Sequence, residues 1–261
     1  MTGVASPLAA ARGRNVAAWG WPLVGIRLAL MLAALIVCVP LHYLLSPLTA
    51  RNPVPRWFLH ALAVIAGVEI RTAGQRVAQR TFFLANHVSW LDIPAMAGIT
   101  GCAFVAHDGL AAIGPLRWLC TLNDTVFVAR HDRRSVARQV EQVRAALRET
   151  GALAMFPERV TSDGTQLLPF KSSLFSALDT EADDIPVQPV WLDYGPETRE
   201  IAWVGEEPGL DNALRILARW RPVNLTITFL PPLTQSERAS RKAIAQAAHT
   251  AIAGAMQAAR G

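Results

Sequence analysis

Apolar residues near the amino terminus form one long run without a charge. Residues 28–39 are all apolar, and Pro40 and His42 are followed by a further apolar stretch that ends at Leu45. A helix needs about 20 apolar residues to cross a bilayer, so the run reaches that length only if Pro40 and His42 are included. The pattern predicts a membrane-associated helix that either spans the bilayer or lies in its surface.

Two other interpretations of this run stay open. Arg12, Arg14 and Arg27 precede it, as basic residues precede the apolar part of a secretory signal peptide. The leader is long, however, and no clear small-residue cleavage site follows, which disfavours cleavage. The other alternative is a buried helix of a soluble domain, because apolar runs of this length also occur there.

Beyond this run the hydrophobic pattern changes to short elements. Trp57–Gly67 carries apolar residues at helical spacing and predicts a second helix at the membrane surface. The strands that we expect after it are Val68–Thr72, Thr81–Ala85, Thr125–Ala129, Ala152–Phe156, Val187–Leu192, Ile201–Val204 and Val223–Leu230. The expected helices are Trp90–Ile99, Val136–Leu147 and a final Ala-rich helix that Ser236 caps.

Strands that alternate with helices indicate an α/β fold, a layered sheet with flanking helices, preceded here by the membrane-associated helical segment. The sheet should be largely parallel or mixed. Such sheets bind ligands beyond the carboxyl ends of their strands. The predicted strand Thr81–Ala85 runs directly into Asn86 and His87, so the chemistry is expected at this end.

Composition narrows the class of protein. Of the 261 residues 52% are hydrophobic and 17% charged, enough for one large core and an apolar surplus. The net charge of +5 favours polyanionic partners, either anionic lipid or nucleic acid. No basic run with interleaved aromatics and no Cys/His finger spacing is present, which disfavours nucleic acid. The cysteines Cys38, Cys102 and Cys120 are few, odd in number and widely spaced, so neither disulfides nor a zinc site is expected.

His87 and Asp92 are the first candidates for catalysis. An imidazole suits the removal of a proton from an alcohol near neutral pH, and a carboxylate on its far nitrogen fixes the tautomer and stabilises the imidazolium. On an ideal helix five residues would leave the two side chains about 140° apart. The pair therefore requires a bent entry, with His87 in a loop and the helix beginning near Ser89.

The same residues also match a purely structural motif. Ser89 and Asp92 have the spacing of a capping box, in which the acidic side chain satisfies backbone amides at the start of a helix. Taken alone, the run from Asn86 to Asp92 favours this structural interpretation.

Further segments strengthen the catalytic interpretation. The run Asn86, His87 and Asp92 is followed in order by a strand ending in Arg130, by Phe156-Pro157-Glu158 with Ser162, and by the proline-containing strand Ile185–Val190. Together these four blocks resemble the glycerolipid acyltransferase family, which includes the 1-acylglycerol-3-phosphate acyltransferases. The resemblance covers roughly Val68–Leu233, and residues 162–173 look most similar to bacterial lyso-ornithine lipid acyltransferases.

The resemblance implies roles for individual residues. His87 is the general base, and Asp92 is its orienting carboxylate. Substrate-binding roles fall on a further set, in which the basic members hold the acceptor's head group and Glu158 closes the pocket: Ser89, Arg130, Glu158, Arg159 and Lys171. For Arg130 the alternative is a solvated charge beside Arg133 and Arg134.

The third block departs from the family pattern at Arg159 and Val160, where the family has glycine and a hydroxyl residue. Glycine there permits positive φ or close approach to an anion, which these side chains do not readily reproduce. Arg159 offers a charged fork to phosphate or carboxylate instead. We therefore expect weakened activity or an altered acceptor preference.

The resulting hypothesis is an O-acyltransferase of membrane lipid synthesis. It would transfer an acyl chain from acyl carrier protein or coenzyme A thioester to a lysolipid, 1-acylglycerol-3-phosphate or lyso-ornithine lipid, without a metal or bound cofactor. We expect a leader (1–22), membrane-associated helices (23–67) and an acyltransferase domain (68–261). The expected location is the bacterial inner membrane with the site on the cytoplasmic side. A lipid hydrolase and a catalytically impaired lipid-binding homologue are the alternatives.

Overall fold

The computed structural model describes residues 16–49, 51–78, 80–107, 114–128, 136–158, 160–171, 175, 185–205 and 207–260. Its strands are β1 (Val68–Gly74), β2 (Thr81–Ala85), β3 (Ala103–His107), β4 (Val126–Val128), β5 (Ala152–Met155), β6 (Val187–Asp193) and β7 (Val223–Phe229). Its α-helices are α2 (Trp21–Leu45), α3 (Val54–Ile65), α4 (Asp92–Thr100), α5 (Gly114–Leu122), α6 (Val136–Thr150), α7 (Thr198–Ile201), α8 (Gly209–Leu217) and α9 (Arg241–Ala258). Short 3₁₀ turns are η1 (Ala18–Gly20), η6 (Gly195–Glu197) and η7 (Ser236–Arg238).

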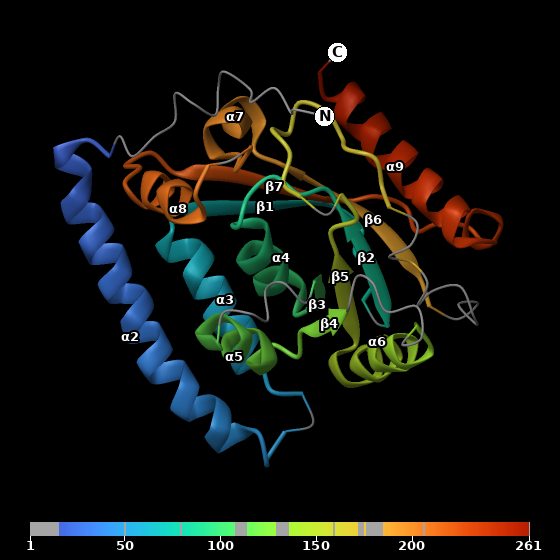
Figure 1. Ribbon diagram of the computed structural model, residues 1–261, viewed down its shortest axis with the longest axis horizontal. Helices are drawn as coiled ribbons and strands as arrows, with labels where there is room; N and C mark the ends of the chain where they lie inside the picture. The colour runs from blue at the N-terminus through green and yellow to red at the C-terminus, as the bar shows by residue number, and fades with distance from the viewer. Residues whose placement is uncertain are drawn as a thin grey trace.

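The strands form one seven-stranded sheet in the order β1-β7-β6-β2-β5-β3-β4 (Figure 1). All neighbouring pairs are parallel except β6 and β7, which are antiparallel. The predicted α/β class with a mixed sheet is therefore confirmed. Strand β2 lies between β5 and β6, so the residues that follow it are surrounded by the ends of two other strands.

Alternation along β2 divides the core into two halves. Phe83 and Ala85 belong to one buried cluster, which includes Ala63 of α3 and Met96 of α4. Phe82 and Leu84 point to the opposite face, where the buried side chains of α6 and α9 pack. Because successive strand residues face opposite sides, a strand covered on both faces is apolar throughout, and every residue of β2 is buried.

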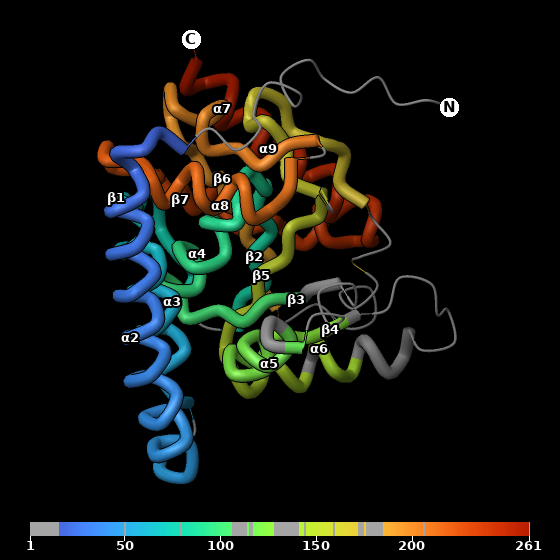
Figure 2. The backbone as a smooth tube through the Cα atoms, turned by 60° about the vertical axis from the view of Figure 1, so that its left-hand side comes forward, coloured from blue at the N-terminus to red at the C-terminus, as the bar shows by residue number. Residues whose placement is uncertain are grey.

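The amino-terminal run forms α2, which continues through Pro40 to Leu45. Figure 2 shows α2 along one edge of the molecule, beside α3. By length and composition, residues 18–45 form the one helical stretch in the described part of the chain that could cross a membrane. Most of its side chains are exposed, which removes the alternative of a helix buried in the core.

One predicted strand and one predicted helix cap are wrong. Ile201–Val204 is not a strand: Ile201 ends the short helix α7, and the Trp203 amide donates a lone hydrogen bond to the Val88 carbonyl instead of joining a ladder. Four consecutive apolar residues are too few to distinguish a strand from a buried turn. The cap of the last helix is Ser240, whose hydroxyl accepts from the Ala243 amide, whereas Ser236 begins η7.

Strand β3 and helices α5 and α8 were not predicted. Strand β3 follows Gly101, which has positive φ and ends α4. Its apolar residues are few and bounded by polar positions, and short strands of this kind carry little periodic signal.

Arg27 links α2 to the end of α8. Its guanidinium donates to the carbonyls of Ile216 and Leu217, at 3.3 and 3.1 Å, where α8 ends. Cations at a helix carboxyl terminus satisfy its free carbonyls. The group also covers Gly67, where an added Cβ would lie 2.4 Å from Nη2 of Arg27.

We expect Arg27→Met to lower the free energy of unfolding by about 1–2 kcal/mol, because two carbonyl contacts are lost from a partly buried site. Hydrogen exchange in detergent should show faster exchange at the first turns of α2. Lys242→Met, at an exposed position on α9, is the matched control. Unchanged exchange in α2 would show that Arg27 is not its anchor.

Candidate active site

Asn86 joins the end of β2 to the neighbouring strand β6. Its amide group donates to the Leu192 carbonyl at 3.0 Å, and its carbonyl oxygen accepts from the Leu192 amide at 2.7 Å. A side-chain amide thus replaces a backbone pair at the point where the chain leaves the sheet. This fixes the position from which the next residue, His87, projects.

His87 and Asp92 are in direct contact. Nδ1 of His87 lies 2.8 Å from Oδ2 of Asp92, whose side chain is fully buried. His87 sits in the loop and α4 begins at Asp92, so the bent entry that the spacing requires is confirmed, with the helix starting three residues later than Ser89. The imidazole keeps 17% of its side-chain surface exposed and is therefore reachable by a substrate.

The structural alternative for Ser89 and Asp92 is realised in one half only, because α4 begins at Asp92 with Leu91 as its N-cap and without a side-chain cap. Oδ2 of Asp92 accepts from the amides of Val88 at 2.7 Å and Ser89 at 2.9 Å, as the acidic residue of a capping box does. The Ser89 hydroxyl is buried and accepts from the Leu91 amide at 3.4 Å. One carboxylate therefore both organises the loop and contacts the histidine, and the two interpretations are compatible. The substrate-binding role of Ser89 stays a prediction.

Aromatic rings restrict the orientation of the imidazole. The ring of His87 stacks on Phe156, with centroids 4.2 Å apart and planes at 13°, and Phe156 stacks in turn near Phe104. Phe156 follows β5 and Phe104 lies in β3, the next strands of the sheet. The imidazole is thus held on one face by stacking and at one nitrogen by Asp92, which leaves Nε2 for another partner.

Tyr194 completes the surroundings of Asp92. Its phenol donates to Oδ1 of Asp92 at 2.6 Å, and both side chains are buried. Burial raises the pKa of Tyr194 well above its ordinary value, and the charge of Asp92 acts in the same direction. The phenol therefore stays a neutral donor. Tyr194 was not predicted as a site residue, although a tyrosine directly after a buried strand, at the same sheet edge as His87, was a usable signal.

Glu158 supports the loop from the third block. One carboxylate oxygen accepts from the His87 amide at 2.8 Å and the other from the Leu168 amide at 2.9 Å. Burial raises the pKa of Glu158 to about 7; the nearby charge of Asp92 adds to this, and the two amide donors oppose it. Both oxygens are thus engaged by the protein's own backbone.

The segment after Glu158 is bonded to the backbone of the loop that carries His87 and to that of Trp203. The Ser162 amide donates to the His87 carbonyl at 2.8 Å, and the Thr161 hydroxyl donates to the Trp203 carbonyl. Gly164 has φ +69°, and an added Cβ would lie 2.2 Å from the Thr198 side chain. A glycine is therefore needed for this segment to pass so closely beside α7.

Of the basic residues expected to bind substrate, the structure describes Lys171. Arg130 and Arg159 lie outside the described residues. The Lys171 side chain is exposed, and its amide donates to the Pro157 carbonyl at 3.2 Å, so the chain at Lys171 lies against the third block. Val160 is 60% exposed. The head-group roles of these residues stay predictions.

Comparisons with known proteins address the family. The acyltransferase family model matches residues 67–193. The lyso-ornithine lipid O-acyltransferase of Rhodobacter capsulatus is 31% identical over 236 residues, covering 88% of this chain and 84% of the relative. The chain belongs to the acyltransferase family. The 1-acyl-sn-glycerol-3-phosphate acyltransferase of Neisseria gonorrhoeae is 29% identical, over 70% of this chain and 72% of its own.

A solved structure agrees with the fold of this acyltransferase. The crystal structure of the 1-acyl-sn-glycerophosphate (LPA) acyltransferase PlsC from Thermotoga maritima aligns with a TM-score of 0.62 at 18% identity. The alignment covers 91% of this chain and 98% of that one. The layered α/β sheet with its amino-terminal helices is thus an architecture that also occurs in PlsC.

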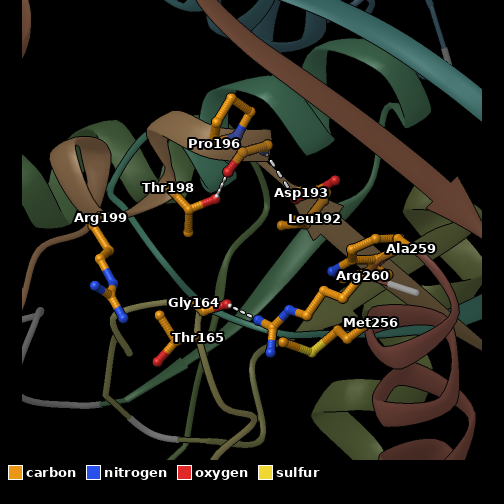
Figure 3. Close-up of a pocket in the computed structure, with 12 residues that line it drawn as sticks. Gly164, Thr165, Leu192, Asp193, Pro196, Thr198, Arg199, Met256, Ala259 and Arg260 are labelled. Carbon is orange, nitrogen blue, oxygen red and sulfur yellow. Dashed lines mark hydrogen bonds between the residues drawn. The ribbon is translucent and has the colours of Figure 1, made fainter.

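The acyltransferase has a cavity of about 510 Å³ at the carboxyl end of β6. Figure 3 shows Arg199 of α7 and Arg260, beyond α9, among its lining residues, and Arg260 donates to the Gly164 carbonyl at 3.2 Å. Asp193 adds a carboxylate to the lining. Neither His87 nor Asp92 lines this cavity, so it does not identify the reacting atoms.

Among the described residues of the acyltransferase, no three His, Cys, Asp or Glu side chains are grouped so that they could hold a metal ion. The expectation of chemistry without a metal or bound cofactor stays a prediction.

The pH dependence of stability tests the environment of Glu158. In the folded state its proton is retained up to about pH 7, whereas the unfolded chain releases it near the ordinary value of 4.5. Stability from this group is therefore fully present below pH 4.5 and is lost as the pH rises through 7. Glutamine does not titrate. We therefore expect the difference in melting temperature, wild type minus Glu158→Gln, to decrease as the pH rises from 4.5 to about 7.

The control is Glu141→Gln, at an exposed position on α6. Its melting temperature, plotted against pH, should run parallel to that of wild type. Parallel curves for Glu158→Gln as well would contradict the raised pKa.

Proposed function

We propose that this acyltransferase transfers a fatty acyl chain from an acyl carrier protein or coenzyme A thioester to the free hydroxyl of a lysolipid, with His87 as general base. The observation that carries the proposal is the 2.8 Å contact between Nδ1 of His87 and Oδ2 of Asp92, at the carboxyl end of β2. An imidazole bound in this way at Nδ1 has Nε2 available to accept a proton.

The reaction is a direct transfer. Nε2 of His87 takes the hydroxyl proton as the lysolipid oxygen attacks the thioester carbonyl, and a tetrahedral intermediate forms. Asp92 stabilises the imidazolium. The intermediate collapses with cleavage of the C–S bond, and the departing sulfur receives the proton from Nε2. The products are the ester and the free thiol, no acyl-enzyme forms, and His87 returns to its starting state.

Lyso-ornithine lipid is the acceptor that we favour, with 1-acylglycerol-3-phosphate as the second candidate. The alignment with the lyso-ornithine lipid O-acyltransferase covers 88% of this chain, against 70% for the 1-acyl-sn-glycerol-3-phosphate acyltransferase. In this proposal Arg130, Arg159 and Lys171 hold the anionic part of the head group. Ser89 and Glu158 form the pocket wall behind the reacting hydroxyl.

Membrane association supplies both lipid substrates. One side of α2 packs near α3 and α8, and its remaining surface exposes large apolar side chains to solvent: Ile26, Leu28, Leu30, Leu32, Ile36 and Val37. Such a surface is favourable against acyl chains. We propose that residues 23–67 attach the acyltransferase domain 68–261 to the cytoplasmic side of a bacterial inner membrane.

The catalytic pair is tested by two substitutions. We expect His87→Ala to lower turnover by about 10²–10⁴-fold, since general-base catalysis typically contributes this much. Asp92→Asn should lower kcat strongly with a smaller change in KM, because the lost charge stabilises the imidazolium rather than the bound substrate. Membrane preparations with a labelled acyl thioester and a panel of lysolipids measure both. Full activity of His87→Ala would refute the mechanism, and binding to vesicles should persist in both variants.

The same assay separates the two alternative functions. Release of free fatty acid in the absence of any acceptor would indicate a lipid hydrolase, in which water replaces the lysolipid. Binding of a lysolipid without acyl transfer to any member of the panel would indicate a catalytically impaired homologue. The altered third block, Arg159 and Val160, is the feature that favours this last alternative.

Arg159 and Val160 can be tested directly. The double substitution Arg159→Gly with Val160→Thr restores the family pattern, and we expect it to change the ratio of activities toward lyso-ornithine lipid and 1-acylglycerol-3-phosphate. Val160→Thr alone separates the contribution of residue 160, which is 60% exposed, from that of Arg159. Unchanged activity on every lysolipid would show that this block does not set acceptor preference.

A further inference from the structure

The two oxygens of Asp92 have separate sets of donors. Oδ2 contacts Nδ1 of His87 and accepts from the amides of Val88 and Ser89. Oδ1 accepts from the phenol of Tyr194 at 2.6 Å. Asp92 is fully buried and Tyr194 is 1% exposed, so water does not compete for either contact.

We propose that Tyr194 is a positioning residue for acyl transfer, whose phenol holds Oδ1 of Asp92 so that Oδ2 faces His87. The proposal rests on the function proposed above, in which His87 is the base. Tyr194 does not touch the reacting atoms; it acts through the carboxylate. The family model ends at residue 193, directly before this tyrosine.

The need for such a group follows from the torsion of an aspartate side chain. The terminal torsion of a carboxylate is broad, so backbone donors on one oxygen alone leave the plane of the group poorly determined. A second donor on the other oxygen fixes the plane. A phenol suits this place because its burial and the adjacent charge keep it protonated. Outer groups of this kind orient the residues that do the chemistry.

The sheet places the phenol with little freedom. Tyr194 follows β6, which pairs with β2 in parallel, and Asn86 binds the backbone of Leu192 two residues earlier. The loop after β2 therefore contacts Oδ2 of Asp92, and the residue after β6 donates to Oδ1. A buried phenol needs a hydrogen-bond acceptor, and a backbone carbonyl would serve. The choice of Oδ1 of Asp92 as the acceptor is therefore not explained by satisfying the phenol alone.

The test is Tyr194→Phe, which removes one oxygen atom. We expect kcat to fall by about 10–100-fold while KM for lysolipid and thioester changes by less than about twofold. Tyr43→Phe is the matched control: the chain has two tyrosines, and Tyr43 is 55% exposed, so its kcat should be unchanged. A folded Tyr194→Phe enzyme with the kcat of wild type would overturn the proposal.

A second variant decides the matter if Tyr194→Phe does not fold. Fluorotyrosine incorporated in the Tyr43→Phe background modifies Tyr194 alone and keeps the hydroxyl. Its more acidic phenol donates more strongly to Asp92, which then stabilises the imidazolium less. The acid limb of the kcat–pH profile should therefore move to lower pH, and an unmoved limb would overturn the proposal.

Glu158 is a further titratable group at the loop, where it accepts from the His87 amide, so the profiles are compared in Glu158→Gln enzyme. The His87→Ala variant distinguishes the two levels of the argument. If His87→Ala is inactive but fluorotyrosine has no effect, only the role of Tyr194 fails. If His87→Ala is fully active, the proposed mechanism with His87 as general base fails, and the role of Tyr194 fails with it.

Discussion

A buried carboxylate is the interaction on which the candidate site depends. An ionised carboxylate is costly away from water unless donors surround it, and Asp92 is met by two backbone amides, an imidazole nitrogen and a phenol. These donors come from the loop after β2 and from the end of β6. Satisfying Asp92 therefore shapes the loop, orients His87 and requires the two strands to lie side by side.

The neighbouring strands contribute support rather than reactive groups. Glu158, after β5, accepts from the His87 amide, and Ser162 donates to the carbonyl of the same residue. The backbone of His87 is thus bonded on both sides by the third block, while Phe156 stacks on its ring. The third family block follows β5 and the fourth overlaps β6, the two strands that pair with β2, so segments far apart in sequence meet at one residue. The strand of the second block, β4, lies at the edge of the sheet.

Features that depend on residues close together in the sequence could be predicted, whereas contacts between distant segments could not. Strand β2 was predicted with its observed bounds, because Thr81 and four apolar residues lead directly into Asn86 and His87. The contact of His87 with Asp92 follows from a loop that is local in sequence. Tyr194 lies 102 residues from Asp92, and no local pattern reports a contact of that separation. Ile201–Val204 failed as a strand because its apolar residues satisfy a turn equally well.

The position of β6 in the sheet has a consequence for synthesis of the chain. Residues 81–92 leave the ribosome about a hundred residues before Tyr194, so the loop and its carboxylate are made long before the donor for Oδ1 exists. In the interval, Asp92 can only be stabilised by water and by its own loop. The finished geometry thus appears late in translation, and a nascent chain that carries His87 does not yet hold an organised base.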